Sequence, residues 1–174
     1  MNDHLPRNYH RRNSPAHPGG GCLGARRAHL SLAEWRIDHP TTDLGSFPRT
    51  AETWQENWAS VLPLPGVKAW GAFEDEVMVG IIVYRPYLTE DMAQLDALFV
   101  DKHHRQQGIA SHLTRLLEKQ AIADGHKRLY VSATESQSAV GFYISRGFVP
   151  TQDAHPELYA LEPNDIHMIK ILVN

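Results

Sequence analysis

The residues from Arg105 to Ala110, RQQGIA, have types and a spacing that suit the binding of a diphosphate. They stand between an alternating apolar segment, QLDALFV, and an apolar stripe at helical spacing that starts after Gly108. Glycine permits a backbone conformation and a close approach that a side chain would block. Free backbone N–H groups at the positive end of a helix attract anions. The pattern therefore predicts an anion-binding loop between a strand and a helix.

Two elements must position this loop. Alternation in the strand before it predicts one face made of Leu95, Ala97 and Phe99, and a second face made of Gln94, Asp96, Leu98 and Val100. After the loop, the period changes to that of a helix, with an apolar stripe of Ile109, Leu113, Leu116, Leu117 and Ala121. Both faces of the strand are therefore expected to be covered.

The run LFVDKHHRQQGIA resembles the signature of the GNAT superfamily, the acyl-CoA-dependent N-acyltransferases. The loop of that family reads Arg or Gln, two variable residues, Gly, one variable residue, then Gly or Ala, and Arg105, Gly108 and Ala110 fill it. A second block, SATESQSAVGFYISRGF, is similar to the family's closing helix and strand. The resemblance implies an α/β fold: a mixed, mostly antiparallel sheet flanked by helices, with acetyl-CoA in a cleft between splayed central strands.

The resemblance also implies which residues bind the coenzyme. The main chain of Leu98, Phe99 and Val100 would hold the pantetheine arm. The loop would take the diphosphate, mainly through backbone N–H groups, and consists of Arg105, Gln106, Gln107, Gly108, Ile109 and Ala110. Ser136 stands where many relatives have an asparagine that hydrogen-bonds the pantetheine arm. Because serine has a shorter reach, this contact is expected to be weaker or mediated by water.

The implied reaction is attack of an amine on the thioester, which needs a base, an oxyanion donor and an acid. Tyr143 occupies the family position for the tyrosine that faces the coenzyme sulfur, and a phenol can protonate a thiolate of similar basicity. A backbone N–H near Leu98 or Phe99 would polarise the carbonyl. Asp96, two residues before Leu98, is the candidate base, and Glu135 is a weaker alternative. Structural roles for both Tyr143 and Asp96 remain open at this point.

Composition is consistent with this interpretation. The chain has 174 residues, 42% of them hydrophobic, with a net charge of −3, so neither a nucleic-acid partner nor a membrane partner is expected. A single cysteine, Cys22, rules out an internal disulfide framework and favours the cytoplasm. No apolar run approaches the roughly 20 residues needed to span a bilayer. A homodimer is left open.

Along the chain, residues 1–26 are rich in Arg, His, Pro and Gly and are expected to form an arm without fixed structure, followed by a single N-acetyltransferase domain at 27–174. Within that domain helices are expected at 27–37 and 50–61. The sequence shows no clear pattern for the family's first strand. The remaining expectations are strands at 67–73, 77–84, 94–100, 128–133, near Phe148 and at 166–172, and helices at 108–123 and 136–145.

Other kinds of site are not favoured. Gly19, Gly21 and Gly24 match a dinucleotide fingerprint, but no strand precedes them. His103, His104 and His112 lack a metal-ligand spacing, so no metal is expected. The function predicted is an N-acetyltransferase that moves the acetyl group of acetyl-CoA to a primary amine of a small molecule or peptide. The alternative is an acyl-CoA-binding regulatory module with little turnover.

Overall fold

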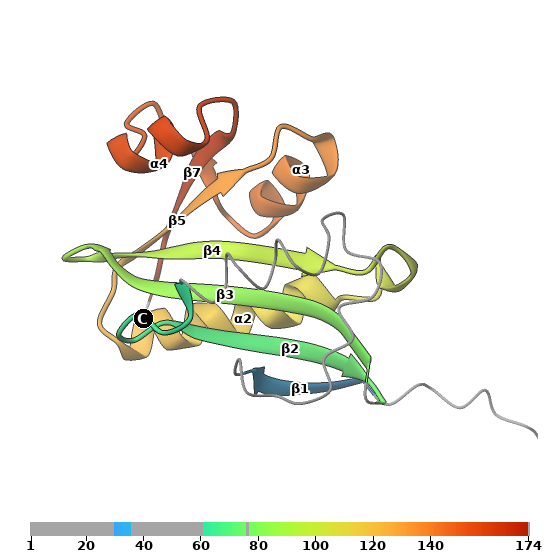
Figure 1. Ribbon diagram of the computed structural model, residues 1–174. Helices are drawn as coiled ribbons and strands as arrows, with labels where there is room; N and C mark the ends of the chain where they lie inside the picture. The colour runs from blue at the N-terminus through green and yellow to red at the C-terminus, as the bar shows by residue number, and fades with distance from the viewer. Residues whose placement is uncertain (1–29, 36–60, 76, 174) are drawn as a thin grey trace, which may run out of the picture.

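The computed structural model describes residues 30–35, 61–75 and 77–173. Figure 1 shows one twisted sheet with helices packed against it. In chain order its elements are β1 (Leu30–Trp35), β2 (Lys68–Glu74), β3 (Val77–Thr89), β4 (Met92–Val100), the 3₁₀ helix η1 (Lys102–His104), α2 (Ile109–Ala123), β5 (Arg128–Ala133), α3 (Gln137–Ser145), β6 (Val149–Pro150), α4 (Pro156–Leu161) and β7 (Ile166–Ile171).

The strands form one sheet in the order β1-β2-β3-β4-β5-β7-β6. The pair β4–β5 is parallel, and the other neighbouring pairs are antiparallel. The mixed, mostly antiparallel sheet that the sequence predicted is therefore confirmed. β4 lies in the middle of the sheet, between the long hairpin partner β3 and the shorter β5.

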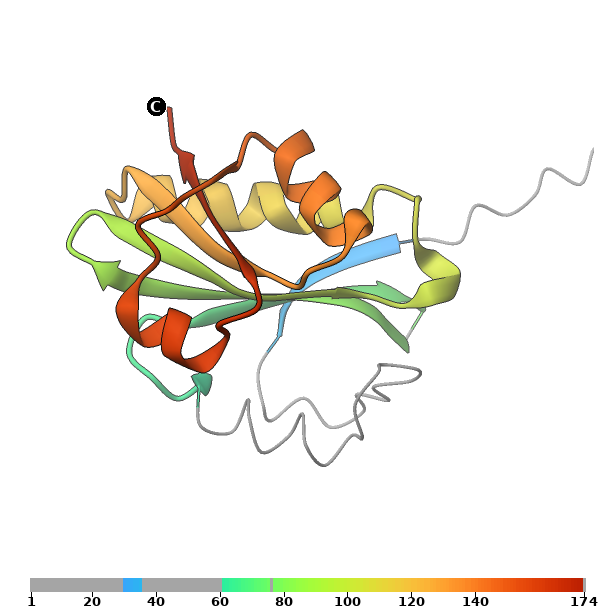
Figure 2. The same ribbon diagram turned by 90° about the horizontal axis from the view of Figure 1, so that it is seen from above.

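The helices cover the two faces of the sheet unequally. Figure 2 shows α2 and α3 on one side of the sheet and α4 on the other. The apolar stripe of α2 packs on its side with Ile109, Leu113, Leu117 and Ala121, all at 1% exposure or less. A second apolar cluster, which includes Ile81, Val83 and Phe73, lies on the opposite face of β2 and β3. Burial of these side chains contributes most of the stabilisation of the fold.

Gly80 in β3 brings α2 close to the sheet. A Cβ atom built on Gly80 would lie 2.9 Å from Cγ2 of Ile109 and 3.3 Å from the carbonyl oxygen of Phe99. Only the absence of a side chain permits this approach. The first residue of α2 is thereby held against β3 and β4, at the end of the sheet where the RQQGIA loop lies.

The structure corrects the prediction of a helix at 27–37. Residues Leu30–Trp35 form β1, which pairs with β2 from Leu30↔Glu74 to Trp35↔Ala69, where the sequence predicted a helix at 27–37. The segment contains leucine, alanine and glutamate, which favour helices in isolation, but six consecutive residue pairs along the sheet edge override that weak preference. The family's first strand is present after all.

Other predictions fall where the structure gives no description. The arm at 1–26 and nearly all of the predicted helix at 50–61 lie outside the described residues. Within the described ranges, no helix is both long and apolar enough to cross a membrane.

Candidate active site

β4 and β5 separate after a short stretch of pairing, and the gap opens a cavity. Their parallel register covers Met92↔Arg128, Ala93↔Leu129 and Gln94↔Tyr130, after which neither strand pairs with the other. Figure 1 shows the two strands diverging toward α3. A cavity of about 510 Å³ lies at this divergence, lined by β4, by β5, by α3 and by the segment around α4.

An irregularity in β4 shapes one wall of this cavity. Val83 pairs with Ala97 and Tyr84 with Leu95, so that Asp96 is an extra residue in the ladder, a β-bulge. Leu95 consequently packs in the cluster under α2, as Leu98 does, while Ala97 packs on the opposite face. The alternation that placed Leu95 with Ala97 and Phe99 is therefore wrong, because the bulge reverses the faces at this point.

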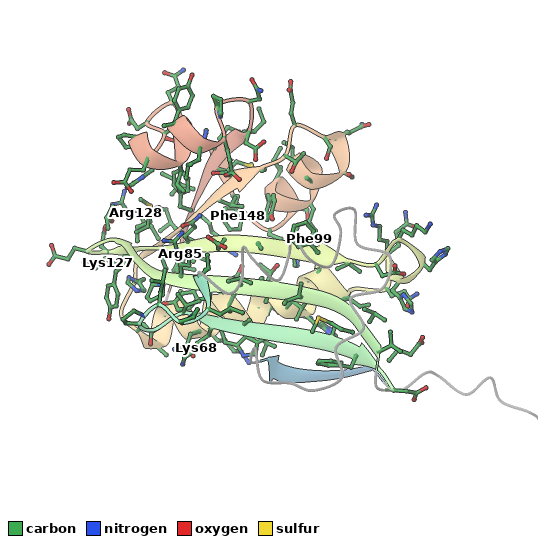
Figure 3. All side chains as sticks on the ribbon, in the orientation of Figure 1. Lys68, Arg85, Phe99, Lys127, Arg128 and Phe148 are labelled. Carbon is green, nitrogen blue, oxygen red and sulfur yellow. The ribbon has the colours of Figure 1, made fainter. Side chains whose placement is uncertain are left out.

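Asp96 faces the cavity from the bulge and contacts a cation. Its Oδ1 lies 3.3 Å from Nη1 of Arg85 in β3, and its side chain is 18% exposed. Arg85 is two residues after Val83 and so lies on the face opposite α2, where Figure 3 labels it. Asp96 therefore leans toward that face rather than sharing the face of Leu98. Burial raises the pKa of the Asp96 carboxyl, and Arg85 offsets only part of the rise.

The RQQGIA loop has the backbone expected of an anion site. Gln106 has φ 63° and Gly108 has φ 83°, both in the left-handed region. Gly108 is the N-cap of α2 and provides no side-chain hydrogen bond to the first turn. The first N–H groups of the helix therefore have no side-chain cap, which is the condition for binding phosphate oxygens. Left-handed backbone at the non-glycine Gln106 costs about 1–2 kcal/mol and is typical of functional loops.

The side chains of Arg105, Gln106 and Gln107 are exposed, and a Cβ atom on Gly108 would meet no atom within 4 Å. Arg105 is exposed, and its Nε donates to the carbonyl of Val100 at 3.3 Å. Gln107 makes a long contact, 3.4 Å, to the carbonyl of His103. The loop consequently presents backbone and open space in front of α2, with the Arg105 charge close by.

Tyr143 reaches the cavity from α3. Its ring is 7% exposed and packs edge to face against Phe142 and Phe148, with ring centroids 5.4 Å and 5.5 Å away. It lines the cavity together with Ala139. Burial raises the pKa of the Tyr143 phenol, which stays protonated at neutral pH. Tyr143 therefore both packs in the core and lines the cavity.

The other candidate residues, for the coenzyme site and, with Glu135, for the base, do not all line the cavity. Leu98 and Phe99 line the cavity, whereas Val100, Ser136 and Glu135 are not among its lining residues. The Ser136 hydroxyl caps α3, accepting from the N–H of Ala139 at 3.2 Å. Serine at this position therefore caps the first turn of α3.

Sequence reasoning missed a group of polar residues opposite Asp96. Glu162 and Asp165, from the segment between α4 and β7, line the cavity with Ser132 of β5. Desolvation raises the pKa of the Glu162 carboxyl, the Asp165 and Asp96 charges raise it further, and the Ser132 hydroxyl opposes the rise. Only the topology brings Glu162 near Asp96, so no local signal in the sequence indicated it.

Within the described residues, no group of three or more His, Cys, Asp or Glu side chains is arranged to hold a metal ion. His104 instead contacts two carboxylates, Asp101 and Glu74.

Comparisons with known proteins agree with this geometry. Residues 30–148 match the model of the acetyltransferase (GNAT) family. Human N-acetyltransferase 8 is 38% identical over 87 residues, which are 47% of this chain and 38% of that protein. The chain spans about half or less of the length of the curated relatives it matches.

Solved structures share the fold at low identity. Ard1 from Thermoplasma volcanium has a TM-score of 0.65 at 22% identity, covering 83% of this chain and 99% of its own. The PaiA N-acetyltransferase from Thermoplasma acidophilum, solved in complex with coenzyme A, has a TM-score of 0.59 at 16% identity and covers 82% of this chain and 99% of its own. With a family match over most of the chain and the splayed-strand cavity in place, the chain belongs to the acetyltransferase (GNAT) family.

Proposed function

We propose that this chain transfers the acetyl group of acetyl-CoA directly to a primary amine, in a ternary complex and without a covalent enzyme intermediate. The observation that carries the proposal is a cavity of about 510 Å³, opened by the divergence of β4 and β5 and reached by Tyr143. The uncapped start of α2 follows β4 through one short loop. The two features suit the thioester end and the diphosphate end of one coenzyme.

In this proposal the loop binds the coenzyme through its backbone. N–H groups from Gln106 to Ala110 donate to the diphosphate, and the Arg105 guanidinium adds charge. The edge of β4 beyond Gln94, which does not pair with β5, offers main-chain donors and acceptors to the pantetheine arm at Leu98, Phe99 and Val100. PaiA, which has the same fold, was solved in complex with coenzyme A, which supports coenzyme binding by this fold.

The chemistry divides between two side chains. The acceptor arrives as an ammonium ion, so a carboxylate first accepts one of its protons and passes it to solvent. The free amine nitrogen then attacks the thioester carbonyl carbon, the same carboxylate accepts the second proton from the attacking nitrogen, and the carbon–sulfur bond breaks. Tyr143 gives its proton to the departing thiolate. Burial disfavours both the tyrosinate form of Tyr143 and the thiolate form of the coenzyme. The cavity that raises the pKa of Tyr143 therefore also raises the basicity of the thiolate.

Asp96 is the proposed base, and the acceptor is an amine that arrives as a cation. Among the described lining residues, the carboxylates Asp96, Glu162 and Asp165 outnumber the one guanidinium of Arg85. An acidic lining attracts an ammonium group. The raised pKa of Asp96 brings its basicity closer to what proton abstraction near neutral pH requires.

Thiol release tests the proposal. The protein is mixed with acetyl-CoA and one class of amine at a time. The classes are small amines, peptides with a free N-terminus and lysine-containing peptides. The free thiol is measured with time. We expect thiol release that depends on one class of amine, with an acetylated product of matching mass. An acyl-CoA-binding module would instead bind the coenzyme without amine-dependent thiol release. The cytoplasmic location and the homodimer stay predictions.

Asp96→Asn tests the base. Because the carboxyl pKa is raised, the wild-type rate should rise with pH along a limb above the usual carboxyl range. The variant should bind acetyl-CoA normally, lose about 100-fold in kcat near neutrality and recover in part at high pH, where the free amine is abundant. Asp165→Asn, at the same cavity, is the matched control. A variant with raised KM at every pH and unchanged kcat would show that Asp96 only binds the acceptor.

A further inference from the structure

His104, at the end of η1, lies between two carboxylates from different elements. Its Nδ1 is 2.8 Å from Oδ1 of Asp101, and its Nε2 is 3.1 Å from Oε2 of Glu74. The His104 side chain is 21% exposed, and that of Asp101 is 13% exposed. Both ring nitrogens are therefore engaged, at a partly buried position between β2 and the segment that leads into the RQQGIA loop.

These contacts determine the charge of the ring. An ionised carboxylate accepts hydrogen bonds and cannot donate them, so each ring nitrogen that faces one must carry a proton. A neutral imidazole has one N–H and could satisfy only one of the two acids. The arrangement is thus complete only for the imidazolium form. The hydrogen bonds that the ring donates to Asp101 and to Glu74, in that order of size, raise the pKa of His104, which agrees with the geometry.

The side chains of Asp101, Glu74 and His104 connect the RQQGIA loop, which is the proposed coenzyme loop, to the sheet. Asp101 directly follows β4, its N–H donates to the carbonyl of Val79, and its carboxylate also accepts from the N–H of His103. Glu74 is the last residue of β2. His104 is followed at once by Arg105, the first residue of the loop. The ion pair with Glu74 therefore fastens the start of the loop to the β2–β3 hairpin.

We propose that His104 is a positioning residue that holds the coenzyme loop in its binding conformation while its ring is protonated, so that affinity for acetyl-CoA decreases as pH rises. This inference rests on the proposed function of the loop. Deprotonation would remove the ring N–H that faces Asp101 or the one that faces Glu74 and would release one of the two attachments. The fold then restrains the left-handed backbone at Gln106 less firmly, and the strain of that backbone needs such support.

Charge acts in the same direction. Imidazolium with two carboxylates carries a net charge of −1, and neutral imidazole with the same two carries −2. The second arrangement repels a diphosphate more strongly. Glu74 and Asp101 are the groups that act on the His104 ring, while Lys102 and Arg105 are the neighbouring cations in sequence.

Calorimetric titration of the full chain with acetyl-CoA, from pH 6 to pH 9, tests the proposal. We expect the wild-type dissociation constant to increase about three- to tenfold across the His104 titration, the scale of one partly exposed charge-assisted contact. His104→Gln should bind weakly at low pH as well and lose this pH dependence. His103→Gln, a substitution at the adjacent exposed histidine, is the matched control and should behave as wild type. Ionisation of acetyl-CoA itself is common to all variants and cancels.

Glu74→Gln separates a titrating role from a merely structural one. It keeps an acceptor oxygen but removes the charge that raises the His104 pKa, so the midpoint of the affinity loss should move to lower pH. NMR of the protein without ligand gives a second measurement, in which the backbone amides from Gln106 to Ala110 should titrate together with the His104 ring.

The outcomes distinguish this proposal from the proposed function. Acetyl-CoA affinity that is independent of pH in the wild type, or an unmoved midpoint in Glu74→Gln, would overturn the role of His104 and leave the proposed function intact. Loop amide signals that do not shift with the His104 titration would also overturn the role of His104. Absence of acetyl-CoA binding at every pH would overturn the proposed function, and with it the coenzyme role of His104.

Discussion

Gly108→Glu should reduce affinity for acetyl-CoA by about 100-fold or more, because like charges about 4 Å apart near a protein surface repel by several kcal/mol. The new side chain would leave the backbone without a collision at its Cβ atom, since a Cβ atom at Gly108 meets nothing within 4 Å. It would instead enter the open space in front of the first N–H groups of α2, where the diphosphate is expected. Calorimetric titration measures the change.

Gly125→Glu is a closely matched control. Gly125 follows the other end of α2, has φ 86°, and also has open space around an added Cβ atom. Both substitutions therefore introduce the same charge and a similar backbone strain, about 1–2 kcal/mol. Equal loss of affinity in both variants, or an unchanged affinity in folded Gly108→Glu, would show that the diphosphate does not bind at this loop.

Tyr143→Phe should lower kcat by about 100-fold or more while the affinity for acetyl-CoA is kept, the usual loss when a general acid is removed. Burial raises the pKa of the phenol, so the wild type keeps this proton from neutral to moderately basic pH. The deficit of the variant should therefore persist across that pH range. Steady-state kinetics at saturating acceptor, from pH 6 to pH 9, provide the measurement.

A packing role for Tyr143 gives a different result. The ring of phenylalanine retains the edge-to-face contacts with Phe142 and Phe148, so the stability of the variant should stay close to that of wild type. Tyr159→Phe removes an exposed hydroxyl and controls for the loss of a phenol elsewhere. Wild-type kcat in Tyr143→Phe would reduce Tyr143 to a core residue.

The parts of the fold that the sequence predicted well are those with local signals. The boundaries of β5 agree with the predicted 128–133, and α2 begins one residue after Gly108. The helix α3 starts after Ser136, whose oxygen caps it. In each case a change of apolar period, a glycine or a capping side chain lies within a few residues of the boundary.

The parts that the sequence could not predict depend on distant contacts. β1 becomes a strand because β2 is available at its side, and the bulge at Asp96 becomes visible only in the register with β3. The six-residue α4 has one buried residue, Leu158, and therefore no stripe to reveal it. Glu162 and His104 gain their partners from elements far away in the chain. A single sequence contains no direct record of such pairings.

A crystal structure of the chain with coenzyme A tests the central claim most directly. The account predicts diphosphate oxygens within hydrogen-bonding distance of backbone N–H groups from Gln106 to Ala110, and a pantetheine arm along β4 beyond Gln94. It also predicts the sulfur beside the Tyr143 hydroxyl, in the cavity between β4 and β5. A coenzyme bound elsewhere, or one whose sulfur lies outside this cavity, would contradict the account.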